Sequence, residues 1–226
     1  MIEIELYFLW FLLYSFIGWV YESMLYTVRQ RKFINRGFLN GPYCPIYGTG
    51  AVLNLLILGR MTNPFLLFFT GAFVDCILEY LTSWGMEQLF HARWWDYRKY
   101  PFNLNGRICL YGALVFGAFS ALLVLVIHPV VDQYTRAIPD PVLHVICIVF
   151  VLILLIDILT TVGGVKKLNR ILQDAAQFLG HEQWLFHRLG VQQKRMLVSF
   201  PALISTRYNQ ALLRIRQALT QRGKEE

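Results

Sequence analysis

Three carboxylates, Glu22, Asp75 and Glu79, lie inside stretches of sequence that are otherwise apolar. A charged residue at the centre of a membrane helix costs about 2.5–3.5 kcal/mol on insertion scales, so such residues are hypotheses for function. Asp75 and Glu79 are four residues apart and therefore share one face of a helix. Two interpretations are open. The carboxylates can hold a helical bundle together, or they can line a polar cavity that opens to the cytoplasm.

A short string of residues occurs twice. Residues 39–48 read LNGPYCPIYG and residues 104–112 read LNGRICLYG. Each copy follows an apolar run that contains a glutamate, Glu22 or Glu79, and each precedes another apolar run. The sequence therefore predicts an internal repeat whose unit is helix, polar loop and helix. If the two units face each other, Glu22 and Glu79 meet in the interior beneath the two loops, with Arg36 and Arg107 as the nearest cations.

Each repeated loop carries an arginine and an asparagine. Arg36 and Arg107 can hold a carboxylate or a phosphate through paired hydrogen bonds, and Asn40 and Asn105 favour caps and turns. Equally, the loops can simply fold over the end of the bundle. We predict one polar cluster, for substrate binding or for structure, with these members: Glu22, Arg36, Asn40, Asp75, Glu79, Asn105 and Arg107.

Sequence motifs of known catalytic and cofactor sites are missing. There is no G-x-S-x-G, no H-E-x-x-H and no Walker A string, and the four cysteines form no C-x-x-C pair. We expect no metal, no cofactor and no ATPase within this sequence. His91 with Asp96 is a candidate acid/base pair, although a single interfacial histidine is more often structural.

The composition indicates an integral membrane protein. Of the 226 residues, 56% are hydrophobic and 15% are charged, against about 45–50% and about 25% in soluble domains. The opening MIEIEL lacks the basic segment of a signal peptide, so we expect the first apolar run to stay as an anchor. The fold class we predict is an all-α polytopic bundle of about five transmembrane helices, followed by a cytoplasmic amphipathic helical tail.

The apolar runs define the expected spans. The second run is short for a membrane crossing, which needs about 20 residues, and a re-entrant segment is the alternative. Residues 129–140 are expected to form a loop, and the glycines and lysines of 163–167 to end the last span. The predicted domains are a bundle of residues 1–165 and a tail of residues 166–226. The predicted spans within the bundle are 6–27, 43–59, 64–89, 107–128 and 141–163.

The distribution of basic residues predicts the orientation. Of 21 Lys and Arg residues, all but Arg60 and Arg136 follow the first and third runs or lie in the tail. By the positive-inside rule the N-terminus is outside and the C-terminus is in the cytoplasm of a bacterial inner membrane. The tail combines this charge with apolar residues at helical spacing. It is expected to bind anionic lipid headgroups or to pack on the protein's own loops, and nucleic acid is not expected.

Five segments together resemble a known family of bacterial membrane proteins. They are GWVYES (18–23), INRGFLNGPYCPIYG (34–48), LEYLTSWGMEQLF (78–90), ARWWDY (92–97) and PFNLNGRICL (101–110). The family is the CmpB-like ABC-transporter type IV family, and the resemblance covers the first four spans. It implies a permease-like subunit of the inner membrane, served by a separate ATP-binding subunit.

Two other functions are open from the residues alone. Carboxylates beside an arginine anion site suit an intramembrane enzyme that acts on a lipid or a lipid-linked substrate. A non-catalytic scaffold or regulator would use the polar groups only to join helices, and its basic tail to recruit partners. Self-association into a homo-oligomer is compatible with any of the three.

Overall fold

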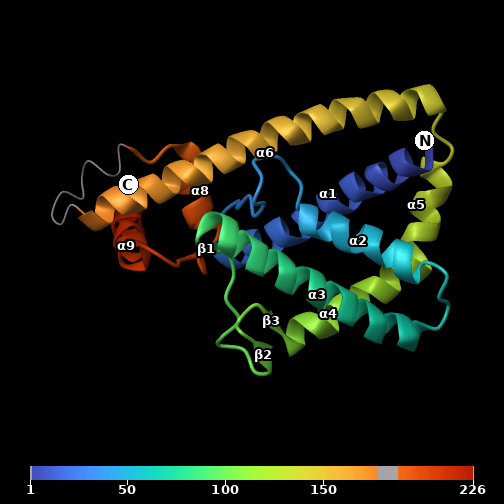
Figure 1. Cartoon of the computed structure of the whole chain (residues 1–226), viewed down its shortest axis with the longest axis horizontal. Coiled ribbons are helices and arrows are strands. Elements are labelled where there is room, and N and C mark those ends of the chain that lie inside the picture. The colour runs from blue at the N-terminus through green and yellow to red at the C-terminus, as the bar shows by residue number, and fades with distance from the viewer. Residues whose placement is uncertain (1, 178–187, 226) are drawn as a thin grey trace.

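The computed structural model describes residues 2–177 and 188–225 as a helical bundle with a helical tail (Figure 1). Two pairs of very short strands are the only sheet in these ranges. The predicted all-α class is therefore confirmed. The helices are α1 (Ile2–Gln30), α2 (Pro45–Leu58), α3 (Pro64–Phe90), α4 (Leu110–Leu122), α5 (His128–Thr135), α6 (Asp140–Gln177), α8 (Val191–Ser199) and α9 (Asn209–Glu225).

Four helical stretches of the described chain are long and apolar enough to cross a membrane. They are Ile2–Gln30, Pro64–Phe90, Leu110–Thr135 and Asp140–Gln177. The shorter apolar α2 lies beside them, and its crossing as a fifth span stays a prediction. Figure 1 shows α1, α2, α3, α4 and α6 running in alternating directions. One end of the bundle carries the N-terminus, α5 and the connection from α2 to α3. The other, which we call the loop end, carries the two polar loops and the tail.

The start of α3 follows the prediction from sequence. Pro64 occupies the first turn, where its missing N–H leaves no helical hydrogen bond unmade. The side chain of Asn63 caps the helix by accepting from the N–H groups of Phe65 (3.0 Å) and Leu66 (3.1 Å). A tight link with a strong cap thus sets where the third span begins.

The predicted loop at residues 129–140 is wrong over most of its length. The fourth pass continues from α4 through a π-helical turn, η1 (Leu123–Ile127), into α5, and ends only at Thr135. In the π turn the N–H of His128 donates to the carbonyl of Leu123, five residues back. This wider turn gives room to the ring of Pro129, which in a regular helix clashes with the carbonyl four residues earlier. The predicted span of 107–128 is therefore too short.

The helix of the fifth span does not end near residue 163, because α6 continues to Gln177, and the predicted end of the span itself stays a prediction. Glycine in a helix interior costs about 1 kcal/mol relative to alanine, but packing can offset this cost. Here Gly164 lets the tail approach: a Cβ at this position would lie 2.1 Å from Oε1 of Gln192. The side chain of Gln193 also donates to the carbonyl of Gly164 at 3.0 Å. The predicted domain division, which stays a prediction, thus falls within a continuous helix.

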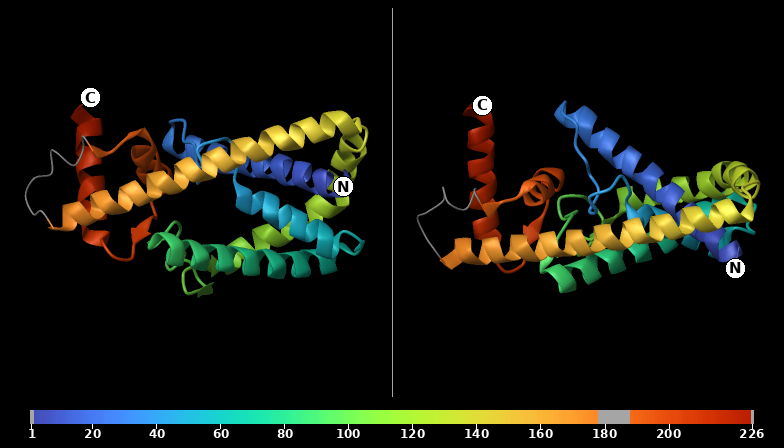
Figure 2. Two further views of the ribbon diagram at one scale, coloured as in Figure 1. Left: turned by 45° about the horizontal axis from the view of Figure 1, so that its top comes forward. Right: turned by 90° about the horizontal axis from the view of Figure 1, so that it is seen from above.

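The tail packs on the protein's own loops and on α6. Two strands, β1 (Ala92–Arg93) and β4 (Ile204–Ser205), pair antiparallel and join the loop after α3 to the tail. Around them lies a core that includes Trp94, Leu172 and Met196. Figure 2 shows α6 projecting past the other long helices to reach α8 and α9. Residues 178–187 of the predicted tail lie outside the described chain, and Ile204, which was counted at helical spacing, is in β4.

Glycines set the closest approaches between helices of the bundle. A Cβ on Gly48 of α2 would lie 2.3 Å from the carbonyl oxygen of Phe11 on α1. A Cβ on Gly117 of α4 would lie 2.6 Å from the carbonyl oxygen of Phe68 on α3. Small residues that allow such backbone proximity are the usual way in which membrane helices associate.

We expect Gly117→Ala to destabilise the bundle, because a backbone carbonyl cannot turn away as a side chain can. Overpacking of this kind costs roughly 1–3 kcal/mol. The matched control is Gly85→Ala in α3, where a Cβ would meet nothing within 4 Å. Thermal unfolding of both variants in detergent measures the difference. Equal midpoints for the two variants would contradict the proposed close contact.

Candidate functional site

The first polar loop folds back into the bundle beside α1. The N–H of Cys44 donates to the carbonyl of Ser15 at 2.9 Å, and Ser15 lies halfway along α1. Helix α2 therefore begins deep in the bundle, and the irregular chain before it covers the rest of the pass. This explains how a helix of 14 residues can belong to the second crossing.

Asp157 of α6 holds the tip of this loop. Its Oδ1 accepts from the N–H of Asn40 (3.0 Å), from the side-chain amide of Asn40 (2.8 Å) and from the hydroxyl of Thr161 (3.0 Å). Its Oδ2 accepts from the N–H of Gly41 (2.8 Å) and the hydroxyl of Tyr43 (2.6 Å). Asp157 therefore has a structural role toward the loop.

Arg195 of α8 satisfies the carbonyls of the same loop. It donates to the carbonyl oxygens of Gly37 (2.7 Å) and Phe38 (3.2 Å). Burial lowers the pKa of Arg195, and the nearby charge of Asp157 acts in the opposite direction. The loop tip is thus clamped from both sides, its N–H groups by a carboxylate and its carbonyls by a guanidinium.

Glu22 and Arg36 form an ion pair, as the sequence suggested, with 3.4 Å between Nε and Oε2. The other carboxylate oxygen of Glu22 accepts from the hydroxyl of Tyr47 at 2.6 Å. Arg36 also donates to the carbonyl of Ser199 and to the hydroxyl of Tyr26, and its guanidinium lies 3.9 Å from the centre of the Tyr26 ring. Every guanidinium nitrogen of Arg36 therefore has a partner within the protein.

Glu79 is 6% exposed and receives one hydrogen bond, from the hydroxyl of Tyr97 at 3.0 Å. Its other oxygen, Oε2, is buried and has no hydrogen-bond partner in the described ranges. Burial raises the pKa of Tyr97, and the charges of Glu79 and then of Glu22 raise it further. No hydrogen bond or ion pair joins Glu79 to Glu22 in the described chain, so the expected meeting of the two glutamates stays a prediction.

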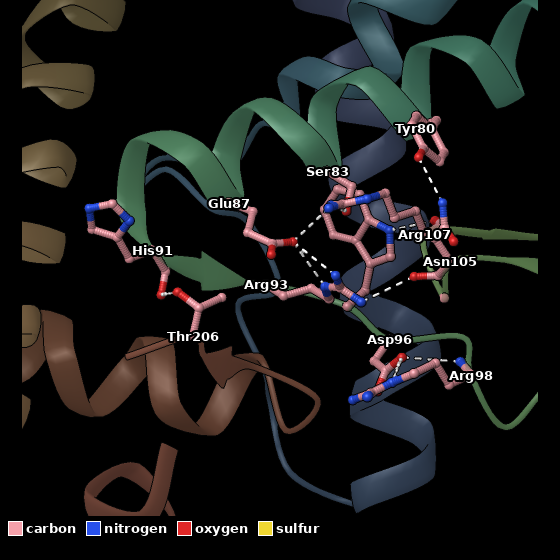
Figure 3. Close-up of polar contacts among 12 residues, drawn as sticks. Tyr80, Ser83, Glu87, His91, Arg93, Asp96, Arg98, Asn105, Arg107 and Thr206 are labelled. Atoms are coloured by element: carbon pink, nitrogen blue, oxygen red, sulfur yellow. Dashed lines mark hydrogen bonds and ion pairs between the residues drawn. The ribbon is translucent and has the colours of Figure 1, made fainter. Parts of the chain in front are cut away.

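Arg107 pairs with a different glutamate from the one expected. Its Nη2 lies 2.8 Å from Oε2 of Glu87, and its Nη1 donates to the hydroxyl of Ser83 at 3.1 Å. Arg93 approaches the same carboxylate oxygen of Glu87 at 3.0 Å. Figure 3 shows this network along the last turns of α3, where Arg107 comes up from the second loop. Expecting Arg107 beside Glu79 was therefore wrong, because Glu87 lies two turns closer to the loop.

The second polar loop is built differently from the first. Its strands β2 (Asn103–Leu104) and β3 (Ile108–Cys109) pair antiparallel around a turn. Asn105 takes a left-handed conformation there, with φ 55°, and its amide donates to the hydroxyl of Tyr80 at 3.0 Å. Cys44 and Cys109, at matching positions of the two strings, are the N-cap residues of α2 and α4. The repeat itself stays a prediction.

The suggested acid/base pair of His91 and Asp96 does not form. Asp96 pairs instead with Arg98 at 2.8 Å, and this guanidinium lowers the pKa of the Asp96 carboxyl. His91 ends α3 in a left-handed conformation, and its carbonyl accepts from Thr206 of the tail. Figure 3 shows His91 and Asp96 well apart.

Asp75 lies one turn deeper than Glu79 on the same helix and has neutral partners only. It accepts from the side-chain amide of Asn54 on α2 (3.0 and 3.1 Å) and from the hydroxyl of Ser120 on α4 (2.9 Å). The seven predicted residues thus do not form one cluster. Glu22 pairs with Arg36, and Asn40 is bound by Asp157. Arg107 and Asn105 belong to the network around Glu87. Asp75 lies in a separate, deeper group, and Glu79 bonds to Tyr97.

Several residues that complete these groups were not expected from the sequence. They are the phenols Tyr47 and Tyr97, the amide Asn54, and Arg195 of the tail. Asn54 could have been found, because it is the one amide inside an otherwise apolar α2. Arg195 carries no local signal, since only tertiary structure brings α8 to the first loop. No group of three or more His, Cys, Asp or Glu side chains forms a metal-ligand set in the ranges described.

Comparison with known proteins identifies the family. The sequence profile of the family described as "Putative ABC-transporter type IV", ABC_trans_CmpB, matches residues 9–162. The chain belongs to this family. The match begins within α1 and ends within α6, so the tail that clamps the first loop lies outside it. No curated protein and no solved structure matches the chain.

We predict that Asp157→Ala releases the first polar loop. The variant removes five hydrogen bonds, including those from the N–H groups of Asn40 and Gly41, and hydrogen bonds to a charged group contribute about 1.5–3 kcal/mol each. Limited proteolysis should then cut near residues 36–44 faster than in the unchanged protein. Asp174→Asn, which alters an exposed carboxylate on the same helix, is the control. Unchanged protection of the loop would show that Asp157 is not its anchor.

Proposed function

We propose that this protein is the membrane-spanning permease subunit of a bacterial inner-membrane transporter. The observation that carries the proposal is the buried carboxylate of Glu79, which has a single hydrogen bond, from Tyr97, together with the half-buried carboxylate of Glu22 on α1. Intramembrane carboxylates that face the bundle interior are typical of substrate and ion pathways. Membership of an ABC-transporter-related family and the apolar helices support the same function.

The proposed topology has the N-terminus outside and the C-terminus in the cytoplasm. The loop end then faces the cytoplasm, and it carries both basic loops and the basic tail (Figure 1). At the opposite end Arg136 pairs with Glu3 at 2.7 Å, so one of the two basic residues expected outside is neutralised there. The positive-inside rule favours this orientation over its reverse.

The proposed energy source is a separate ATP-binding subunit, because the sequence has no Walker A string. Such a subunit would contact the loop end, where β1 and β4 join a bundle loop to the tail. The tail would transmit its movement to the first polar loop through Arg195 and through Arg36, which contacts Ser199. This arrangement supports a mechanical link from the cytoplasmic surface to the start of α2.

The hydrogen bonds of the two loop arginines favour transport over catalysis on a lipid substrate. An enzyme with a phosphate-bearing substrate needs an arginine with free donors beside its carboxylates. Arg36 is committed to Glu22, Tyr26 and Ser199, and Arg107 to Glu87 and Ser83. Both loop arginines therefore act within the fold, which favours the permease over the intramembrane enzyme.

We expect Glu22→Gln and Glu79→Gln each to reduce uptake while the protein level is maintained. A hydrogen bond to a charged group contributes about 1.5–3 kcal/mol, which corresponds to roughly 10- to 100-fold in rate. Glu3→Gln, at the opposite end of the bundle, should transport normally. Uptake assays in membrane vesicles, with immunoblots for the amount of protein, make the comparison.

The subunit role has its own test. Purification from the native host in mild detergent should recover an ATP-binding protein with this chain, and truncation at residue 190 should lose it. Recovery of no such protein, together with unchanged uptake in both glutamine variants, would exclude the permease function. Altered lipid composition in a deletion strain would then point to the enzyme.

A further inference from the structure

A polar triad lies at the centre of the bundle, away from both loops. Asp75 is near the middle of α3, Asn54 is on α2 and Ser120 is on α4. Asn54 is 2% exposed and Ser120 is 1% exposed. Three different helices thus direct one polar side chain each to a common point, at the depth where transporters hold substrate and coupling ions.

The carboxylate of Asp75 has no positive partner. Its hydrogen bonds come from the amide of Asn54 and the hydroxyl of Ser120, and no ion pair includes it in the described chain. Its titratable neighbours on α3 are Cys76 and Glu79, and neither is a cation. From α2 and α4 only the non-titrating Asn54 and Ser120 face it. An isolated buried carboxylate is costly unless a cation or a proton neutralises it.

The triad also has an oxygen without a partner. Oδ1 of Asn54 is buried and accepts no hydrogen bond in the described chain. A half-turn of the Asn54 side-chain amide exchanges the positions of its nitrogen and oxygen, and the shape of the group changes little. The turned oxygen would join the carboxylate of Asp75 and the hydroxyl of Ser120. The carbonyl of Gly50 lies beside them, 2.9 Å from the amide nitrogen of Asn54.

Two glycines let the helices approach closely at the triad. A Cβ on Gly50 would lie 3.1 Å from Oδ1 of Asp75. A Cβ on Gly71 would lie 2.5 Å from the hydroxyl of Ser120 and 3.4 Å from Oδ1 of Asn54. Any larger residue at either position would crowd the oxygens. The absence of side chains at these two positions therefore allows the polar groups of three helices to meet.

We propose that Asp75, Asn54 and Ser120 form a binding site for a monovalent cation, either an alkali metal ion or a proton. The donors are all oxygen once the amide turns, which suits a hard cation, and the single carboxylate matches a single positive charge. The bound cation removes the uncompensated charge and links α2, α3 and α4. This site is separate from the carboxylates of Glu22 and Glu79 and does not depend on the proposed permease function.

Thermal unfolding of the purified full-length protein tests the metal ion. We expect saturating sodium, lithium or potassium chloride to raise the midpoint by about 5 to 10 °C over choline chloride at equal ionic strength. Asp75→Asn should abolish this shift, and Ser120→Ala should reduce it. Asp132→Asn, which removes a carboxylate near Arg136 at the far end, should retain it in full.

Infrared spectroscopy in choline chloride tests the proton. If no alkali ion shifts the midpoint, the unchanged protein should show the carbonyl band of a protonated carboxyl group at neutral pH. Asp75→Asn should lose that band, and if this variant does not fold, Ser120→Ala should shift its frequency. Absence of both an ion-specific stabilisation and an Asp75 carboxyl band would overturn the proposal. Neither readout requires transport, so a failed uptake assay leaves this result unaffected.

Discussion

An irregular backbone segment inside an apolar bundle must have its polar groups satisfied by the protein, because no water is there to do so. The segment of residues 36–44 is irregular, and although Asn40 and Pro42 are exposed, Gly37, Leu39 and Cys44 are buried and follow this rule. Asp157 receives its N–H groups, Arg195 donates to its carbonyls, and Ser15 accepts the last N–H before α2. Without these partners the second crossing could not begin halfway along α1.

This constraint explains why the tail is part of the bundle and not an appendage. Arg195 reaches the loop only because α6 extends beyond the other helices and the chain then turns back through α8 (Figure 2). The same return brings the carbonyl of Ser199 to Arg36, and the hydroxyl of Ser199 to the carbonyl of Asn35 at 2.6 Å. Arg195 and Arg216 of the tail donate to backbone carbonyls, and binding of the tail to anionic lipid stays a prediction.

Much of the fold could be predicted from composition and local signals, whereas the partners of the polar residues could not. The apolar runs located α1, α2, α3, α4 and α6, and Asn63 with Pro64 fixed the start of α3. The helix through Gly164 was missed because its stability comes from Gln192 and Gln193, which are distant in sequence. The ion pair of Glu22 with Arg36 was foreseen from nearby residues. The pairing of Arg107 with Glu87 depended on how far the second loop reaches, which spacing does not specify.

The four intramembrane carboxylates differ in how completely their surroundings neutralise them, and this difference suggests where movement is possible. Asp157 has five donors, so it is a fixed part of the scaffold, whereas Glu22 has Arg36 and Tyr47 as partners. Glu79 has one phenol, and Asp75 has only an amide and a hydroxyl. Both of these lie on one face of α3, toward the glycine-lined contacts with α2 and α4. A carboxylate with a full set of hydrogen bonds loses some of them when it changes partner. A carboxylate with few partners can gain hydrogen bonds from such a change. The working surface of the protein is therefore expected on this face of α3, with α6 and the clamped loop as the fixed frame against which it acts.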